Sequence, residues 1–233
     1  MPPQPLSSKR RSAKISLDPA ALSRHPQLAA CIATIVAYWS RIEATLGSML
    51  GAMLGGEARP SIAMYQAILN TQTQMAVLEA AAKVALSPNN LRVLNALIWL
   101  CKRAGAHRHK VAHWLWGDSQ DLPNRLILVD PDAIREHDKA MSDVAAAFAR
   151  GEVPVALPKI DLNLAFVWEE KDFTEAIQEL LTVYHLALRF SALLLDGGKT
   201  ENPSIAAQRM QLLASPQIQE ALRILEKSNS DGL

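Results

Sequence analysis

The sequence predicts an all-α protein: a helical bundle with a small β-hairpin or meander inserted between its third and fourth long helices. Three observations support this fold class. Hydrophobic residues make up 49% of the 233 residues and charged residues 20%, which is ample material for a buried core. Apolar residues recur at helical spacing through most of the chain. The spacing changes to alternation only within about residues 114–171.

Residues 1–24 are expected to form a disordered tail. Residues 1–14, MPPQPLSSKRRSAK, are rich in Pro, Ser and basic residues and have no apolar period. Such a segment buries too little apolar surface to offset its ordering entropy. Its basic side chains are able to contact phosphate, but short basic runs are common and weakly specific, so a solubilising tail is the favoured interpretation.

The first long helix is predicted to run from Leu28 to the pair Gly55 and Gly56. Glycine favours the left-handed conformation that ends helices. The apolar positions alternate steps of four and three, which gives a continuous seam that needs a partner helix from the same chain or another. These positions are Leu28, Ile32, Ile35, Trp39, Ile42, Leu46, Met49 and Met53.

Two further helices are predicted before the insertion. The second follows Pro60 and continues to Leu86, where the segment SPNN at 87–90 interrupts the pattern. The third begins after Asn90 and runs toward a cluster of histidines. We expect Gly105 to loosen it just before that cluster, because glycine is a poor helix former.

The insertion is predicted to hold strands and one helix. Trp114 and Trp116 alternate with Leu115, the polar segment GDSQDLPN follows, and RLILVD resumes the alternation, which indicates a β-hairpin. Asp130 and the proline after it start a helix that continues to Ala149. The segment KIDLNLAFVW alternates again and is able to add a third strand.

The remainder is predicted to be helical. Asp172 and the glutamate three residues later have capping-box spacing and open a fourth long helix that ends at Gly197 and Gly198. Asn202 and Ser215 each precede a proline, the pattern of a helix cap, so two shorter helices close the chain. The predicted organisation is a tail at 1–24, a bundle at 25–200 with the insertion at about 114–171, and a helical extension at 201–233.

The whole-chain properties restrict the partners and the compartment. The formal net charge is +1, so any anionic partner must be attracted by a local patch. The apolar runs are shorter than the roughly 20 residues of a membrane span, so no membrane association is expected. Cys31 and Cys101 lie in apolar helical pattern, and no secretory leader is recognisable, which favours the cytoplasm.

The main candidate functional residues lie in RHKVAHW, residues 108–114. His109 and His113 lie in this segment and His107 directly precedes it, so three of the six histidines cluster here. His109 and His113 are four apart and share one helix face. Arg108 and His113 are five apart, about 140° round the axis and about 7.5 Å along it. We therefore expect that one chain alone does not easily bring Arg108 and His113 to a single atom, whereas two copies related by a twofold axis do so.

These residue types suit the cleavage of an RNA phosphodiester without a metal. One imidazole accepts a proton and another donates one, while the guanidinium binds phosphate oxygens and stays charged. Two alternatives remain open. Arg108 and His113 are also suited to complement the negative end of the helix dipole, and His109 with His113 are spaced for zinc but lack an obvious third ligand. No metal or cofactor is expected.

The segment RHKVAH at 108–113 resembles the signature of the HEPN superfamily, in which an Arg followed by a polar residue precedes a His that commonly follows Ala. Arg108, His109, Ala112 and His113 match it, and the resemblance covers residues 27–113 and 172–196. His109 stands where Asn is most common, and Trp114 stands where a small residue often follows.

The resemblance implies a HEPN-like bundle and a homodimeric, metal-independent endoribonuclease, of the kind found in toxin–antitoxin, phage-defence and RNA-processing systems. Arg108 would clamp phosphate, His113 would be general base and acid, and His109 would position or transfer a second proton. Trp114 would stack a base or block entry, and Arg103 and His107 would widen the positive patch or form a solvated face. RNA and an antitoxin are the implied partners. Other superfamily members are non-catalytic, so a scaffold or a nucleotide- or RNA-binding module is the alternative.

Overall fold

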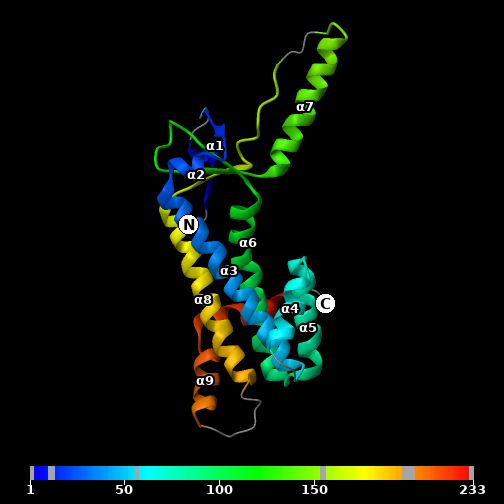
Figure 1. The fold of residues 1–233 in the computed structure, drawn as a ribbon, viewed down its shortest axis with the longest axis vertical. Coiled ribbons are helices and arrows are strands. Elements are labelled where there is room, and N and C mark those ends of the chain that lie inside the picture. Colours follow the sequence, from blue (N-terminus) through cyan, green and yellow to red (C-terminus); the bar gives the residue numbers. More distant parts are fainter. Residues whose placement is uncertain (1–2, 10–13, 56–57, 153–155, 196–202, 231–233) are drawn as a thin grey trace. The chain divides into compact units, whose positions relative to one another are not determined.

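The structure is a computed structural model that describes residues 3–9, 14–55, 58–152, 156–195 and 203–230 (Figure 1). It is mostly helical, as predicted, and contains a small antiparallel sheet. In chain order the elements are β1 (Gln4–Pro5), α1 (Leu6–Lys9), β2 (Ser16–Leu17), α2 (Ala21–Arg24), α3 (Pro26–Met53), α4 (Ala58–Ala67), α5 (Thr71–Ala85), α6 (Pro88–His113), β3 (Leu115–Asp118), β4 (Leu126–Val129), α7 (Pro131–Ala149), β5 (Ala165–Trp168), α8 (Glu170–Leu195), α9 (Pro203–Leu213) and α10 (Pro216–Ser230).

The chain divides into two compact units. Unit 1 comprises Met1–Ile35 and His107–Ile177, and unit 2 comprises Val36–Ala106 and Gln178–Leu233. Helices α3, α6 and α8 each contribute residues to both. These units do not follow the predicted boundaries after residues 24 and 200, because the N-terminal residues belong with the insertion and the C-terminal helices belong with the bundle.

Unit 1 contains the sheet, whose strand order is β1-β5-β4-β3-β2 with every neighbouring pair antiparallel. The predicted hairpin is β3 with β4, in which Trp116 lies opposite Leu128. The predicted third strand is β5, which pairs with β4 through Leu128 opposite Phe166. The sheet is larger than predicted because two more strands come from the N-terminal segment.

The N-terminal segment is the main correction to the predicted organisation. Instead of a disordered tail, its described residues form both edge strands, with Gln4 opposite Val167 in β1–β5 and Ser16 opposite Asp118 in β2–β3. Leu6 is fully buried. The segment is mostly polar and basic on average, so its composition does not reveal that single apolar residues such as Leu6 are buried. The strands that pair with this segment lie about a hundred residues or more away in the sequence. Arg10 and the residues through 13 lie outside the described residues.

The two faces of the sheet are covered differently. One face forms an apolar cluster in which Ile127 and Val167 pack with Leu6, and with Ala133 at the start of α7. Successive strand residues point to opposite faces. Trp168 therefore belongs to the other face, where it is fully buried and its ring lies 4.9 Å from that of Phe173 in α8.

Unit 2 is entirely helical among its described residues. The segment predicted as one helix from Pro60 to Leu86 is two helices, because α4 ends and α5 starts afresh at Asn70. The Asn70 side chain accepts a hydrogen bond from the Thr73 backbone N–H at 3.1 Å, a standard N-cap. The buried Gln74 amide donates to the carbonyls of Tyr65 and Ile68 and so satisfies the end of α4. The cap signal at Asn70 is visible in the sequence but was masked by the apolar spacing.

Helices α6 and α8 begin earlier than predicted, at Pro88 and Glu170. Asp172 is not the N-cap of α8: it lies in the first turn and accepts a hydrogen bond from the Glu169 backbone N–H at 2.8 Å.

Helices α7 and α10 begin where they were predicted. Helix α7 begins after Asp130, whose side chain accepts from the Asp132 backbone N–H, and α10 begins at Pro216 after Ser215. Gly56, Gly197, Gly198 and Asn202, predicted to end or cap helices, lie outside the described residues.

Gly105 has a different role from the one predicted. It lies inside α6, where a Cβ would stand 2.8 Å from Cη2 of the buried Trp39 ring. The glycine is therefore needed for the close packing of α6 on α3 within unit 2, and the helix continues through it without interruption.

Candidate functional site

The candidate site lies in the last two turns of α6, within unit 1. The helix ends at His113, and the backbone N–H of Trp114 still donates to the Lys110 carbonyl at 3.0 Å. Strand β3 begins two residues after the helix ends. This immediate junction fixes the basic end of α6 beside the sheet.

Arg108 and His113 contact each other within one chain. Nη1 of Arg108 lies 3.3 Å from Nε2 of His113. The two side chains meet although they are five residues apart, because the long arginine side chain reaches along the helix to its last residue. That one chain does not easily bring both to a single substrate atom, as the helical wheel led us to expect, stays a prediction. Arginine has only donors, so Nε2 accepts and the neutral imidazole carries its proton on Nδ1.

His109 completes the cluster. Its ring centroid lies 4.8 Å from that of His113, with the two planes inclined at 49°. Both histidines are exposed, so solvent and ligands have access to them. The cluster thus places two imidazoles and one guanidinium together at the surface of a single chain.

The electrostatics of the cluster favour a neutral His113. Desolvation of the ring lowers the pKa of His113 below its usual value, and the neighbouring His109 and Arg108 lower it further because they disfavour a second positive charge. At neutral pH this imidazole is able to accept a proton.

Arg108 is more enclosed than the two histidines. Its residue is half-buried, and Nε is buried with no hydrogen-bond partner among the described residues. The Nη1 end reaches His113. One edge of the guanidinium is therefore enclosed by protein, while the other belongs to the cluster.

Trp114 and His107, predicted to bind RNA, both pack against β5. The Trp114 ring lies 5.5 Å from Phe166, and the His107 ring meets Trp168 edge-on at 6.2 Å. Both residues are half-buried. Trp114 follows the exposed His113 in the chain and packs on Phe166.

Arg103 is not part of the cluster. It lies in unit 2, where its guanidinium forms an ion pair with Glu179 and stands 5.1 Å from the centre of the Trp99 ring. Its charge is thus engaged by a carboxylate and by an aromatic face. The predicted extension of the positive patch through Arg103 has no support in these contacts.

Lys110 and Phe166 were missed by the sequence analysis. The Lys110 ammonium lies 5.2 Å from the Trp114 ring centre and 5.4 Å from that of Phe166. Burial lowers the pKa of Lys110, and Asp130 opposes that shift. The separation of four residues between Lys110 and Trp114, at the end of the predicted helix, was a usable signal. Phe166 gave none, because it is distant in the sequence.

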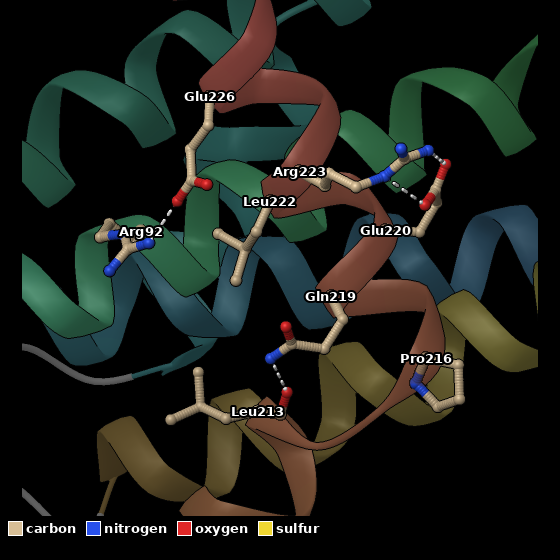
Figure 2. A pocket seen from close by; sticks show the side chains of 8 residues that line it. All are labelled: Arg92, Leu213, Pro216, Gln219, Glu220, Leu222, Arg223 and Glu226. Atoms are coloured by element: carbon tan, nitrogen blue, oxygen red, sulfur yellow. Dashed lines mark hydrogen bonds and ion pairs between the residues drawn. The ribbon is translucent and has the colours of Figure 1, made fainter.

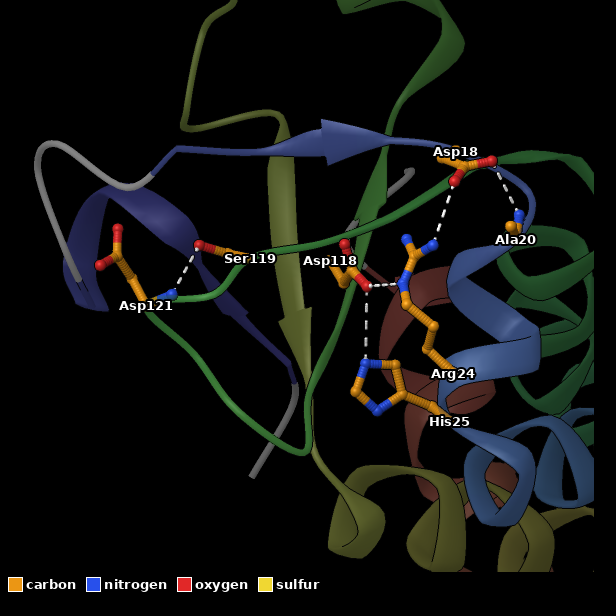
Figure 3. A network of polar contacts seen from close by, with 7 residues as sticks. All are labelled: Asp18, Ala20, Arg24, His25, Asp118, Ser119 and Asp121. Atoms are coloured by element: carbon orange, nitrogen blue, oxygen red, sulfur yellow. Dashed lines mark hydrogen bonds and ion pairs between the residues drawn. The ribbon is translucent and has the colours of Figure 1, made fainter.

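A second polar cluster lies elsewhere in unit 1 (Figure 3). Asp118 Oδ2 accepts a hydrogen bond from Arg24 Nε at 2.7 Å and lies 3.8 Å from His25 Nε2. Arg24 Nη1 also donates to Asp18 at 3.1 Å. A hollow of about 930 Å³ borders this cluster. Because Arg24 is already paired with two carboxylates, the cluster is poorly suited to bind an anion.

A third feature is a hollow of about 620 Å³ in unit 2, between α6 and α10 (Figure 2). Its charged residues pair with one another, Arg92 with Glu226 and Arg223 with Glu220. None of the predicted site residues lines it.

Among the described residues, no three His, Cys, Asp or Glu side chains are placed to hold a metal ion together. None of the described helices combines the length and the apolar character that a membrane crossing requires. No family model matches the chain, and no curated protein or solved structure is significantly similar to it.

Proposed function

We propose that the protein is a metal-independent endoribonuclease of HEPN type, with its active site at the end of α6. The observation that carries the proposal is the contact of Arg108 Nη1 with His113 Nε2 at 3.3 Å, with the His109 ring beside it. These are the three groups that the cleavage chemistry requires: a base, an acid and a charged clamp for phosphate.

The contact between Arg108 and His113 suggests the order of events. In the free site Arg108 donates to the lone pair on Nε2 that a base would use. A bound phosphodiester takes over the donors of Arg108 and frees Nε2. His113 then accepts the proton of the ribose 2′-hydroxyl while the 2′-oxygen attacks phosphorus. The P–O5′ bond breaks, and protonated His109 donates a proton to the leaving oxygen, which yields a 2′,3′-cyclic phosphate and a 5′-hydroxyl end.

The surroundings and partners belong to the same proposal. Trp114, supported by Phe166, would offer an aromatic surface for a base next to the scissile phosphate, and His107 would add to the positive patch. A homodimer would bring a second copy of the site to the same cleft. A toxin, phage-defence or RNA-processing role, with an antitoxin as partner of a toxin, fits such an activity.

The test is cleavage of a mixed-sequence RNA with EDTA present throughout. His113→Ala is expected to reduce the rate by about 10²–10⁴-fold, the usual contribution of a general base, and Arg108→Ala by about 10²–10³-fold, the cost of one electrostatic stabiliser. Lys139→Ala, which removes an exposed cation on α7, is the control and should cleave normally. Cleavage that persists in both His113→Ala and Arg108→Ala would reject the proposal.

A non-catalytic scaffold or RNA- or nucleotide-binding module is the second candidate. Its support is the half-buried Arg108, because a partly enclosed guanidinium suits phosphate binding without catalysis. Binding of the same RNA with full strength, no cleavage, and loss of binding in Arg108→Ala would support this alternative.

A further inference from the structure

Helix α7 carries a seam that is only partly covered among the described residues: Ile134, His137 and Val144 are half-buried, whereas Met141 and Phe148 are exposed. Ala133 is its one buried residue among those described, and Met141 and Phe148 are 40% and 57% exposed. Its N-terminal turn is anchored, where Ala133 and Ile134 join the apolar cluster on the sheet, and Nδ1 of His137 is buried one turn further along. Figure 1 shows the helix leaving the strands from that end.

The spacing of this seam is that of a coiled coil. Its members follow one another at steps of three, four, three and four, which is the pattern of a and d positions. They are Ile134, His137, Met141, Val144 and Phe148. A helix of 19 residues is about 28 Å long, so the seam offers a little over two heptads to a partner helix.

The residues beside the seam allow a helix to approach closely. Ala140 and Ala147 flank it on one side and Asp138 and Ala145 on the other, so the side chains between the two backbones are short. This arrangement suits a straight helix partner better than a loop or a small molecule.

The distribution of charge selects an antiparallel copy of the same helix. The residues from 144 to 149 carry no charge, whereas the first half of α7 is densely charged, with Asp132, Arg135, Glu136, Asp138 and Lys139. Parallel pairing would put the two charged halves, each with an acidic excess, side by side. Antiparallel pairing puts each charged half against an uncharged one and also opposes the helix dipoles.

In the antiparallel orientation, the seam residues of one copy pack against the seam residues of the other. Layers of an antiparallel pair join an a position to a d position, so Phe148 would pack on the partner's His137 and Met141 on the partner's Val144. The twofold axis repeats both layers, which gives four in all. We propose that α7 is a self-association element through which two copies of this chain pair antiparallel. The proposal does not depend on the ribonuclease activity.

The size of the contact predicts its strength. Stable interfaces bury on the order of 1,200–2,000 Å², and one pair of helices of this length reaches at most the low end of that range. We therefore expect a dimer that dissociates at micromolar concentrations.

The test is sedimentation velocity of the full chain across micromolar concentrations. The wild type should shift from monomer to dimer, whereas Met141→Glu and Phe148→Glu should remain monomeric. Ser142→Glu and Ala146→Glu add the same charge to the same helix away from the seam and should dimerise normally. Circular dichroism confirms that all four variants stay folded, as their exposed positions lead us to expect.

Orientation is tested by cysteine cross-linking. Phe148→Cys mixed with His137→Cys should form a mixed disulfide under mild oxidation, whereas Phe148→Cys alone should form no more dimer than the wild type, which controls for Cys31 and Cys101. A wild type that stays monomeric, or dimers that survive Met141→Glu and Phe148→Glu, would overturn the proposal. Efficient self-linking of Phe148→Cys would overturn its antiparallel form.

Discussion

Unit 1 contains the dipeptide Arg-His twice, and the two arginines differ in their partners: one is paired with carboxylates and the other contacts an imidazole. Arg24 and His25 lie next to Asp118, and Arg24 is paired with both Asp118 and Asp18 (Figure 3). Arg108 instead contacts His113, with His109 beside that ring. A guanidinium between two carboxylates is neutralised and serves structure. A guanidinium beside imidazoles keeps its charge for a ligand, so the partners decide the chemistry and the dipeptide does not.

The largest expected effect tests whether the two arginines differ in catalysis. Arg108→Lys keeps the charge but loses the planar fork of donors, so we expect RNA cleavage to fall by about 10²-fold. Arg24→Lys should cleave at the wild-type rate. Equal rates for both variants in single-turnover assays would remove the distinction between the two clusters.

A smaller effect is expected on stability. Here the cluster around Asp118 should be the sensitive one, and the cluster around His113 should not. Asp118→Asn weakens the charged hydrogen bond from Arg24 and the interaction with His25, so the melting temperature should fall by a few degrees. Asp143→Asn, at an exposed position on α7, is the matched control and should melt as the wild type does. His113→Asn should also melt close to the wild type, because its contacts are at the surface. A greater loss in His113→Asn than in Asp118→Asn would show that the structural cluster has been misassigned.

The smallest expected effect concerns the pKa of His113, which reports the positive charges around this ring. NMR titration of the His113 ring should give a pKa below the usual value of about 6.5. His109→Ala or Arg108→Ala removes one positive neighbour and should raise that pKa slightly, while desolvation keeps it low. The neutral form is the base, so the acidic limb of the wild-type cleavage profile should follow the His113 pKa that the NMR titration gives. A His113 pKa at or above the usual value in the wild type would contradict this account.

The two cysteine thiols are not activated as nucleophiles. Burial raises the pKa of Cys101 to about 12, and desolvation also raises that of the half-buried Cys31. Both therefore remain protonated at neutral pH.

The sequence by itself determined the elements whose signals are local. The apolar spacing of α3 and α6, the cap at Asp130 and the alternation in β3 and β4 each involve residues within a few positions of one another. The same holds for the identity of the candidate cluster, since Arg108, His109 and His113 are neighbours on one helix. Even so, their actual contact required the reach of the arginine side chain, which a helical wheel does not include.

Only the tertiary structure decided which distant segments meet. Arg24 and Asp118 are 94 positions apart, and the edge strands at Gln4 and Ser16 pair with strands that no local pattern links to them. Such contacts depend on how well two surfaces fit once both have formed. A linear pattern contains no measure of that fit, which is why the N-terminal segment was predicted to be disordered and is instead part of the sheet.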